Sequence, residues 1–167
     1  DEGIKGQDSF FHKRELADEY GWRNFGELHA DHEALEHGND GSLISHYNNQ
    51  YDPVLGFTKQ FLMSGSPQWF ELMNDLAQHV NDIDIYRTKK DRPEFNNGLF
   101  WHTDHYLDAH TCTHRTYSLE HTKASHTAQT GGGPGTEHCY ATGLAYHYLL
   151  TGDEQSRQTV IDLANWM

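Results

Sequence analysis

The segment FWHTDHYLDAHTCTHRTYS, residues 100–118, concentrates side chains that can transfer protons or contact a substrate. It holds four histidines, two tyrosines, two aspartates, an arginine, a cysteine and a tryptophan. On a helix, His102 and Tyr106 would share one face. Histidines at this spacing can also bind zinc, but neither HTDH nor HTCTH matches the HExxH pattern of zinc proteases. We expect no metal or other cofactor, with a divalent metal ion as the alternative. Most of the fourteen histidines are expected to be hydrogen-bonded structural residues.

Two further segments carry polar side chains suited to binding. SHYNNQYD, residues 45–52, offers amides that can bind a carboxylate or sugar hydroxyls, although such residues are also common in turns. GGGPGTEHCY, residues 131–140, is a glycine-rich turn that lets the backbone approach a ligand, and it lacks the lysine of a phosphate-binding loop. Glu137 and His138 would face that ligand from the first turn of a helix. Alternatively, Glu137 is only a negative charge at a helix N-terminus.

The elements that position these segments are predicted to be helical hairpins. Apolar residues in YDPVLGFTKQFLMSG follow one helical face, with Asp52 as the N-cap and Pro53 in the first turn. SGSP ends this helix, and a second follows. Residues 137–167 match residues 50–80 at a constant offset without a gap, aligning glycines, aspartates and apolar positions. A repeated helix–turn–helix unit indicates a stacked or closed helical array.

The spacing leaves room for a third hairpin, so we expect hairpins near 50–84, 97–130 and 137–167. Each polar segment precedes the first helix of one hairpin, the third being NNGLFWHTDHY, residues 96–106. If the hairpins lie parallel, the three segments meet at one end of the array. This convergence is the main argument from the residues for a binding site.

Composition limits the classes of function. The net charge of −13 makes a nucleic-acid partner improbable on electrostatic grounds, and there is no apolar run long enough to cross a membrane. Residues 1–20 read as a polar lead-in with at most a short helix, and residues 21–33 as strand or irregular structure. Cys112 and Cys139 form one disulfide or are two buried thiols. The abrupt start and end suggest a piece of a longer protein.

Several long motifs occur together in an order that resembles a known family. They are GWRNFGELHADHE, SHYNNQYD, DIDIYRTKKDRPEFNNGLFWHTDHYLDAHTCTHRTYS and GGGPGTEHCY followed by HYLLTGD. Over about residues 20–167 the chain is similar to the α/α-toroid domain of the exo-rhamnogalacturonan lyase family. The resemblance implies an all-α fold in which residues 21–167 form part of an α/α toroid. It also implies a larger multidomain parent protein whose other domains are partners of this one.

The activity implied is β-elimination at a uronic acid of a pectin-like, acidic polysaccharide, in a secreted or periplasmic protein. Toroid lyases commonly use His and Tyr for proton transfer, and Asn, Gln, His or Arg to neutralise the uronate carboxylate. The candidate catalytic residues are His102, His105, Tyr106 and His138. His105 or His102 would be the base, Tyr106 the acid, and His138 would assist. The candidate substrate-binding residues are Asn48, Asn49, Tyr51, Asn97, Trp101, Arg115 and Glu137.

Two other functions stay open. A glycoside hydrolase on the same scaffold would use a carboxylate pair drawn from Glu33, Asp104, Asp108 and Glu137. A non-catalytic helical array would bind carbohydrate or form assemblies without turnover. Fold class alone does not distinguish these from a lyase.

Overall fold

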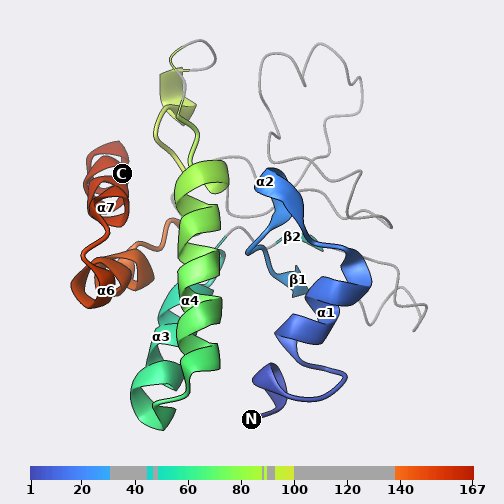
Figure 1. The fold of residues 1–167 in the computed structure, drawn as a ribbon. Helices are drawn as coiled ribbons and strands as arrows, with labels where there is room; N and C mark the ends of the chain where they lie inside the picture. Colours follow the sequence, from blue (N-terminus) through green and yellow to red (C-terminus); the bar gives the residue numbers. More distant parts are fainter. Residues whose placement is uncertain (31–44, 47–48, 88, 90–92, 100–137) are drawn as a thin grey trace, which may run out of the picture.

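The computed structural model describes residues 1–30, 45–46, 49–87, 89, 93–99 and 138–167 (Figure 1). Within these ranges the chain is mostly helical, as predicted. The helices are η1 (Glu2–Ile4), α1 (Phe10–Ala17), α2 (Gly21–Asn24), α3 (Pro53–Ser64), α4 (Pro67–His79), η3 (Val80–Asp84), η4 (Pro93–Phe95), α6 (Thr142–Thr151) and α7 (Glu154–Trp166). Two short strands, β1 (His29–Ala30) and β2 (Ser45–His46), pair antiparallel. In Figure 1, α6 and α7 lie on one side of α4 and α1 and α2 on the other.

Two helical hairpins, α3–α4 and α6–α7, lie where the sequence predicted them. Each first helix ends at a glycine in the left-handed region, Gly65 at φ 66° and Gly152 at φ 76°. In both turns the glycine N–H donates to the carbonyl four residues earlier at 2.7 Å. The preceding hydroxyl, of Ser64 or Thr151, donates to its own helix and accepts the N–H that follows the glycine. The two turns therefore use the same hydrogen bonds at matching positions.

Each second helix is held by an arginine from outside its hairpin. Asp75 of α4 pairs with Arg14 of α1 at 3.0 Å, and both side chains are largely buried. Asp162 of α7 occupies the matching position and pairs with Arg87 at 2.9 Å. The matched aspartates found in the sequence thus anchor the segments that precede each hairpin.

The two hairpins pack directly against each other through α3 and α6. Gly143 of α6 lies against the start of α3, where an added Cβ would overlap the Asp52 carboxylate and the Leu55 nitrogen. Val54 and Leu144 are completely buried in the core. Most of the predicted middle hairpin, near 97–130, lies outside the described residues.

The first thirty residues cover the opposite side of α3 and α4. The Phe10 ring packs edge-on against Phe57 at 5.1 Å between centroids, and Phe57 packs against the buried Trp69. The lead-in is therefore part of the core and contains the helix α1. Residues 21–33 were expected to be strand or irregular, but they begin with the helical turn α2. The N–H of Phe25 closes that turn by donating to the Gly21 carbonyl at 3.0 Å.

A buried histidine links α6 to both α7 and α4. His147 lies with Nδ1 2.7 Å from the Ser156 hydroxyl and Nε2 3.2 Å from the Asn74 side chain. The Ser156 hydroxyl donates to Asp153, so it accepts a hydrogen bond from the Nδ1–H of His147. Burial lowers the pKa of His147 from 6.5, and the nearby Asp153 partly opposes this. His147 is one of the structural histidines that the sequence led us to expect.

Substituting two matched glycines tests the packing of α6 on α3. We expect Gly143→Ala to destabilise the fold by about 2 kcal/mol or more, because the methyl group displaces the start of α3. Gly56 is exposed and has no atom within 4 Å of an added Cβ among the described residues. Gly56→Ala should therefore raise stability by up to about 1 kcal/mol. Urea unfolding of both variants gives the comparison, and equal effects would contradict the packing.

The His147 environment predicts a pH dependence of stability. Its folded pKa lies below its unfolded value near 6.5, so the unfolded state binds more protons between the two. Stability should accordingly fall as pH drops below 6.5 toward the folded value. Thermal melting between neutral pH and about pH 5 measures this loss, and His147→Gln should reduce the slope. An unchanged slope in His147→Gln would assign the acid sensitivity to other groups.

Candidate functional site

The starts of α3 and α6 bring three rings together at one end of the hairpins. Tyr51, just before α3, is 62% exposed, and its ring meets His138 edge-on at 5.3 Å between centroids. His138 is half-buried and lies 6.3 Å from the ring of Tyr140, again edge-on. Tyr51 and His138 come from segments that are far apart in the sequence. Their contact is an edge-on imidazole–phenol pair at the surface, and both residue types can transfer protons.

Two buried side chains beneath the rings hold this arrangement. The Asp52 carboxylate caps α3 by accepting the Leu55 N–H at 3.2 Å. It also accepts the Gly143 N–H, at 2.9 Å to Oδ2 and 3.2 Å to Oδ1, and so caps α6 as well. Asn49, which is fully buried, donates to the Tyr140 carbonyl at 3.0 Å. One carboxylate and one amide therefore fix the two helix starts relative to each other.

The charge of Asp52 is held in an environment that disfavours it. Burial raises the pKa of the Asp52 carboxyl, while the N–H groups of Gly143 and Leu55 lower it, in that order of size. The N-terminal ends of α3 and α6 attract negative charge through their dipoles and free N–H groups. Asp52 already supplies that charge, so these two helix ends are not open to an anionic ligand.

The backbone at this end is strained. Three residues have φ in the left-handed region, which residues other than glycine rarely adopt. They are Asn49 at 59°, Tyr51 at 62° and Asp52 at 56°. Asn97 has the same conformation, with φ of 66°. Residues of this kind cluster at binding and catalytic sites, where packing and hydrogen bonds maintain the strain. Here the hydrogen bonds of Asn49 and Asp52 maintain it.

The third polar segment begins beside the other two. Leu99 and Cys139 are both buried in the core, and the Leu99 backbone N–H donates to the Cys139 sulfur. Leu99 also pairs with Ile85 in an isolated antiparallel bridge. Leu99 and Cys139 therefore lie next to each other in the core. The predicted convergence of the segments at 45–52, 96–106 and 131–140 thus holds for the ends that the structure describes.

Cys139 is a free, buried thiol. Burial raises its pKa to about 11, although the hydrogen bond from Leu99 lowers it in part. A thiol with this pKa stays protonated at neutral pH and is a poor nucleophile. Of the two readings of the cysteines, Cys139 fits the buried thiol. Cys112 lies outside the described residues.

The described residues include four of the predicted site residues. Tyr51 and His138 are in contact at the surface, whereas Asn49 is buried and its amide bonds backbone groups. Asn97 is half-buried, and its backbone N–H donates to the Tyr86 carbonyl. The other candidates lie outside the described residues: Asn48, Trp101, His102, His105, Tyr106, Arg115 and Glu137.

A buried acidic cluster around His79 was not predicted from the sequence. Nδ1 of His79 donates to the Phe25 carbonyl at 3.0 Å. Its Nε2 faces two buried carboxylates, 3.4 Å from Asp84 and 3.8 Å from Glu27. Asp84 ends the π-helical turn η3, an irregularity often found near functional sites. In the sequence, residues 80–84 continue the apolar spacing of the preceding helix. They were therefore predicted to be the end of an ordinary helix, and the π-helical turn was not recognised.

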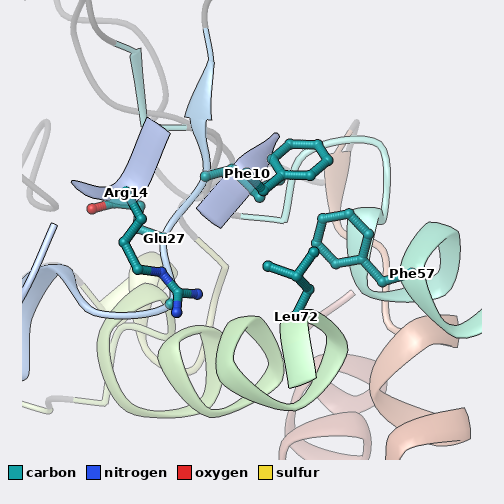
Figure 2. Close-up of a pocket in the computed structure, with 7 residues that line it drawn as sticks. Phe10, Arg14, Glu27, Phe57 and Leu72 are labelled. Atoms are coloured by element: carbon teal, nitrogen blue, oxygen red, sulfur yellow. The ribbon is translucent and has the colours of Figure 1, made fainter. Parts of the chain in front are cut away.

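Two hollows lie away from the ring pair. The first is a cavity of about 10 Å³ between α1, α3 and α4, the space of one water molecule. Figure 2 shows Arg14 on one side of it and Phe10, Phe57 and Leu72 on the other. The second is an open surface hollow beside α1 that Tyr20, Phe25 and Glu71 help to line. The first cavity is too small for a sugar ring.

The part of the chain that the structure describes holds neither a cluster of metal ligands nor a helix that could span a membrane. In those ranges, no three His, Cys, Asp or Glu side chains are arranged to hold a metal ion. None of the helices described there is both long and apolar enough to cross a membrane.

No family model matches the chain, and neither a curated protein nor a solved structure matches it.

The double cap made by Asp52 predicts an unusually large cost for its removal. Asp52→Ala should cost about 3 kcal/mol, because two buried N–H groups from different helices lose their acceptor. Asp153 is the comparison, since it caps the single helix α7, accepts the Ser156 hydroxyl of that helix and bonds no backbone N–H of another helix among the described residues. Asp153→Ala should cost about 1 kcal/mol.

Denaturant unfolding measures both values, and the His138 resonances in NMR report whether the Tyr51 ring stays in contact. Asp52→Asn retains one acceptor oxygen and removes the buried charge, so we expect a smaller loss than in Asp52→Ala. Equal costs for Asp52→Ala and Asp153→Ala, with unchanged His138 resonances, would show that Asp52 does not join the helices.

Proposed function

We propose that the chain is part of an α/α toroid in a polysaccharide lyase that cleaves a uronate-containing, rhamnogalacturonan-like substrate by β-elimination. The observation that carries this proposal is the contact between the exposed Tyr51 ring and His138. The pair combines the two residue types that toroid lyases commonly use for proton transfer.

Helix packing supports the toroid. The α3–α4 and α6–α7 hairpins have matching turns, and their first helices lie side by side with both starts at one end. Repeated units of this kind bury their apolar faces against their neighbours. In a ring of such hairpins, the segments before the first helices would surround a common end, where a polysaccharide would bind.

The reaction requires two proton transfers and the neutralisation of one carboxylate. A base removes the proton at C5 of the uronate, and the electrons of that C–H bond form a double bond between C4 and C5. The bond from C4 to the glycosidic oxygen breaks, and an acid protonates that oxygen. His138 as the base and Tyr51 as the acid would supply both steps from adjacent positions.

The uronate carboxylate must be neutralised to make the C5 proton acidic enough. The N-terminal ends of α3 and α6 do not serve this purpose, because Asp52 occupies both. The sequence candidates for the role are Asn48 and Arg115, outside the described residues.

From the sequence, His105 or His102 is predicted to be the base and Tyr106 the acid, with Tyr51 a substrate contact. His102, His105 and Tyr106 lie outside the described ranges. His138 and Tyr51 take the two roles in this proposal because their contact is described. The secreted or periplasmic location follows from the proposed substrate.

Ultraviolet absorbance of the unsaturated uronate product tests the activity. The protein at its full natural length is incubated with rhamnogalacturonan and a panel of other uronate polysaccharides, with and without a chelator. We expect the signal to rise, and Tyr51→Phe and His138→Ala each to reduce turnover by about 100-fold or more. Tyr20→Phe and His12→Ala, on the α1–α2 side, are controls that should leave turnover unchanged.

The other outcomes are distinct. Reducing ends released without the ultraviolet signal would identify a hydrolase. The catalytic residues would then be a carboxylate pair drawn from Glu33, Asp104, Asp108 and Glu137. Binding without turnover on any polysaccharide would identify a carbohydrate-binding array. A lyase signal that persists unchanged in both Tyr51→Phe and His138→Ala would keep the activity but reject this pair as its acid and base.

A further inference from the structure

The second hairpin departs from its match with the first at Tyr140. At the constant offset between the hairpins, Tyr140 corresponds to Pro53, the first residue of α3. The helix α6, however, begins only at Thr142, two positions later in the match. Tyr140 therefore lies ahead of its helix, in the same segment as His138 of the ring pair.

The side chain of Tyr140 is not used to hold the fold together. Tyr140 is 39% exposed and does not belong to the hydrophobic core. Among the described residues, its hydroxyl makes no hydrogen bond to the protein, whereas the hydroxyl of Tyr20 donates to Glu15. A tyrosine that stabilises a fold normally buries its ring and pairs its hydroxyl. A role in binding therefore accounts for the Tyr140 ring better than a role in the core.

The backbone of Tyr140, by contrast, is fixed on both sides. Its carbonyl accepts the side-chain amide of the fully buried Asn49 at 3.0 Å, and its N–H donates to the His138 carbonyl at 3.1 Å. The side-chain oxygen of Asn49 accepts the Val54 N–H at 3.4 Å, which ties this support to α3. A ring on a fixed backbone loses little conformational freedom when a ligand contacts it, so the contact is pre-organised.

Tyr51 and Tyr140 both contact the imidazole of His138. The Tyr51 ring lies at 5.3 Å with an interplanar angle of 88°, and the Tyr140 ring at 6.3 Å with an angle of 68°. Within the described ranges, no ring contact joins the two tyrosines, so each phenol meets a different part of the imidazole. A sugar ring bound at His138 would therefore lie within reach of both phenols.

We propose that the ring of Tyr140 is the stacking face for the uronate ring from which His138 removes the C5 proton, an inference that rests on the proposed function. The C–H groups of a sugar ring carry slight positive charge, and the face of an aromatic ring is negative. Stacking also removes apolar surface from water. The contact needs the aromatic ring and not its hydroxyl, so Tyr140 contributes to binding and not to proton transfer.

A neutral stacking contact suits the charges of the two partners. The chain carries a net charge of −13, so a uronate polysaccharide is repelled at long range, most strongly at low salt. Contact with a neutral ring provides affinity that salt does not screen. The contact is present both before and during proton removal, so it should lower KM and have little effect on kcat.

Kinetics of the protein at its full natural length on rhamnogalacturonan oligosaccharides test this role. We expect Tyr140→Ala to raise KM by about tenfold and to leave kcat within about twofold. Tyr140→Phe keeps the ring and should match the unsubstituted protein. The pH profile of kcat should stay the same in both variants, because the base and the acid are untouched. Tyr20→Ala, at a residue that is 44% exposed on the α1–α2 side, is the control and should leave KM unchanged.

Calorimetric titration with a rhamnogalacturonan oligosaccharide measures binding without turnover. The Tyr51→Phe variant serves as the background, since it keeps the ring beside His138 and removes the proposed acid. Adding Tyr140→Ala should weaken binding by about tenfold, and by the same factor at low and high salt. Circular dichroism melting of each variant verifies the fold.

The results distinguish this role from the lyase activity. Unchanged KM and Kd in Tyr140→Ala would overturn the stacking role while an ultraviolet signal upholds the lyase. An equal loss in Tyr140→Phe, or an altered pH profile of kcat, would also overturn it, because the hydroxyl would then be responsible. Binding that depends on the Tyr140 ring, without the ultraviolet signal, would uphold stacking and reject the lyase. Absence of binding to any of the uronate polysaccharides would overturn both.

Discussion

A single carboxylate, that of Asp52, joins the starts of two helices that are distant in the sequence. The N-terminal N–H groups of a helix have no partner within the helix, and each needs an acceptor when it is buried. Asp52 supplies that acceptor for Leu55 in α3 and for Gly143 in α6. Gly143 has no side chain to keep the carboxylate away, so the two hairpins approach closely. The ring pair at the surface depends on this bond, because Tyr51 and His138 lie within a few residues of its two ends.

The segment from Asn49 to Asp52 is held by hydrogen bonds, although its backbone conformation and its buried carboxylate are unfavourable in free energy. Three left-handed residues within four positions and a buried carboxylate all cost free energy. Elsewhere the same hairpins follow ordinary rules, with glycines at the left-handed turns and apolar residues in the core. Local rules are typically broken where a protein has a functional demand. The concentration of such terms around Tyr51 therefore agrees with the placement of the proposed site.

The sequence predicted the two hairpins because their signals are local and repeated. The cap at Asp52, the turn glycines and the apolar periodicity each involve residues within one or two helical turns. Asn49 was assigned to substrate because residue type does not show that its amide points inward to the Tyr140 carbonyl. The bond from Asp52 to Gly143 and the cluster around His79 were not predicted, since each joins segments that are more than forty residues apart. No periodic pattern encodes contacts of that range.

The proximity of Leu99 and Cys139 has a consequence for how this protein can diverge. Both ends of the chain between them are fixed in one core, so changing the number of intervening residues does not alter the distance to be spanned. For a flexible chain, the entropy of joining two points grows only with the logarithm of the length between them, at about 0.6 kcal/mol for each doubling. The core around Leu99 and Cys139 therefore sets the free energy of their contact more than the exact number of residues between them does. A change in that number costs the contact little.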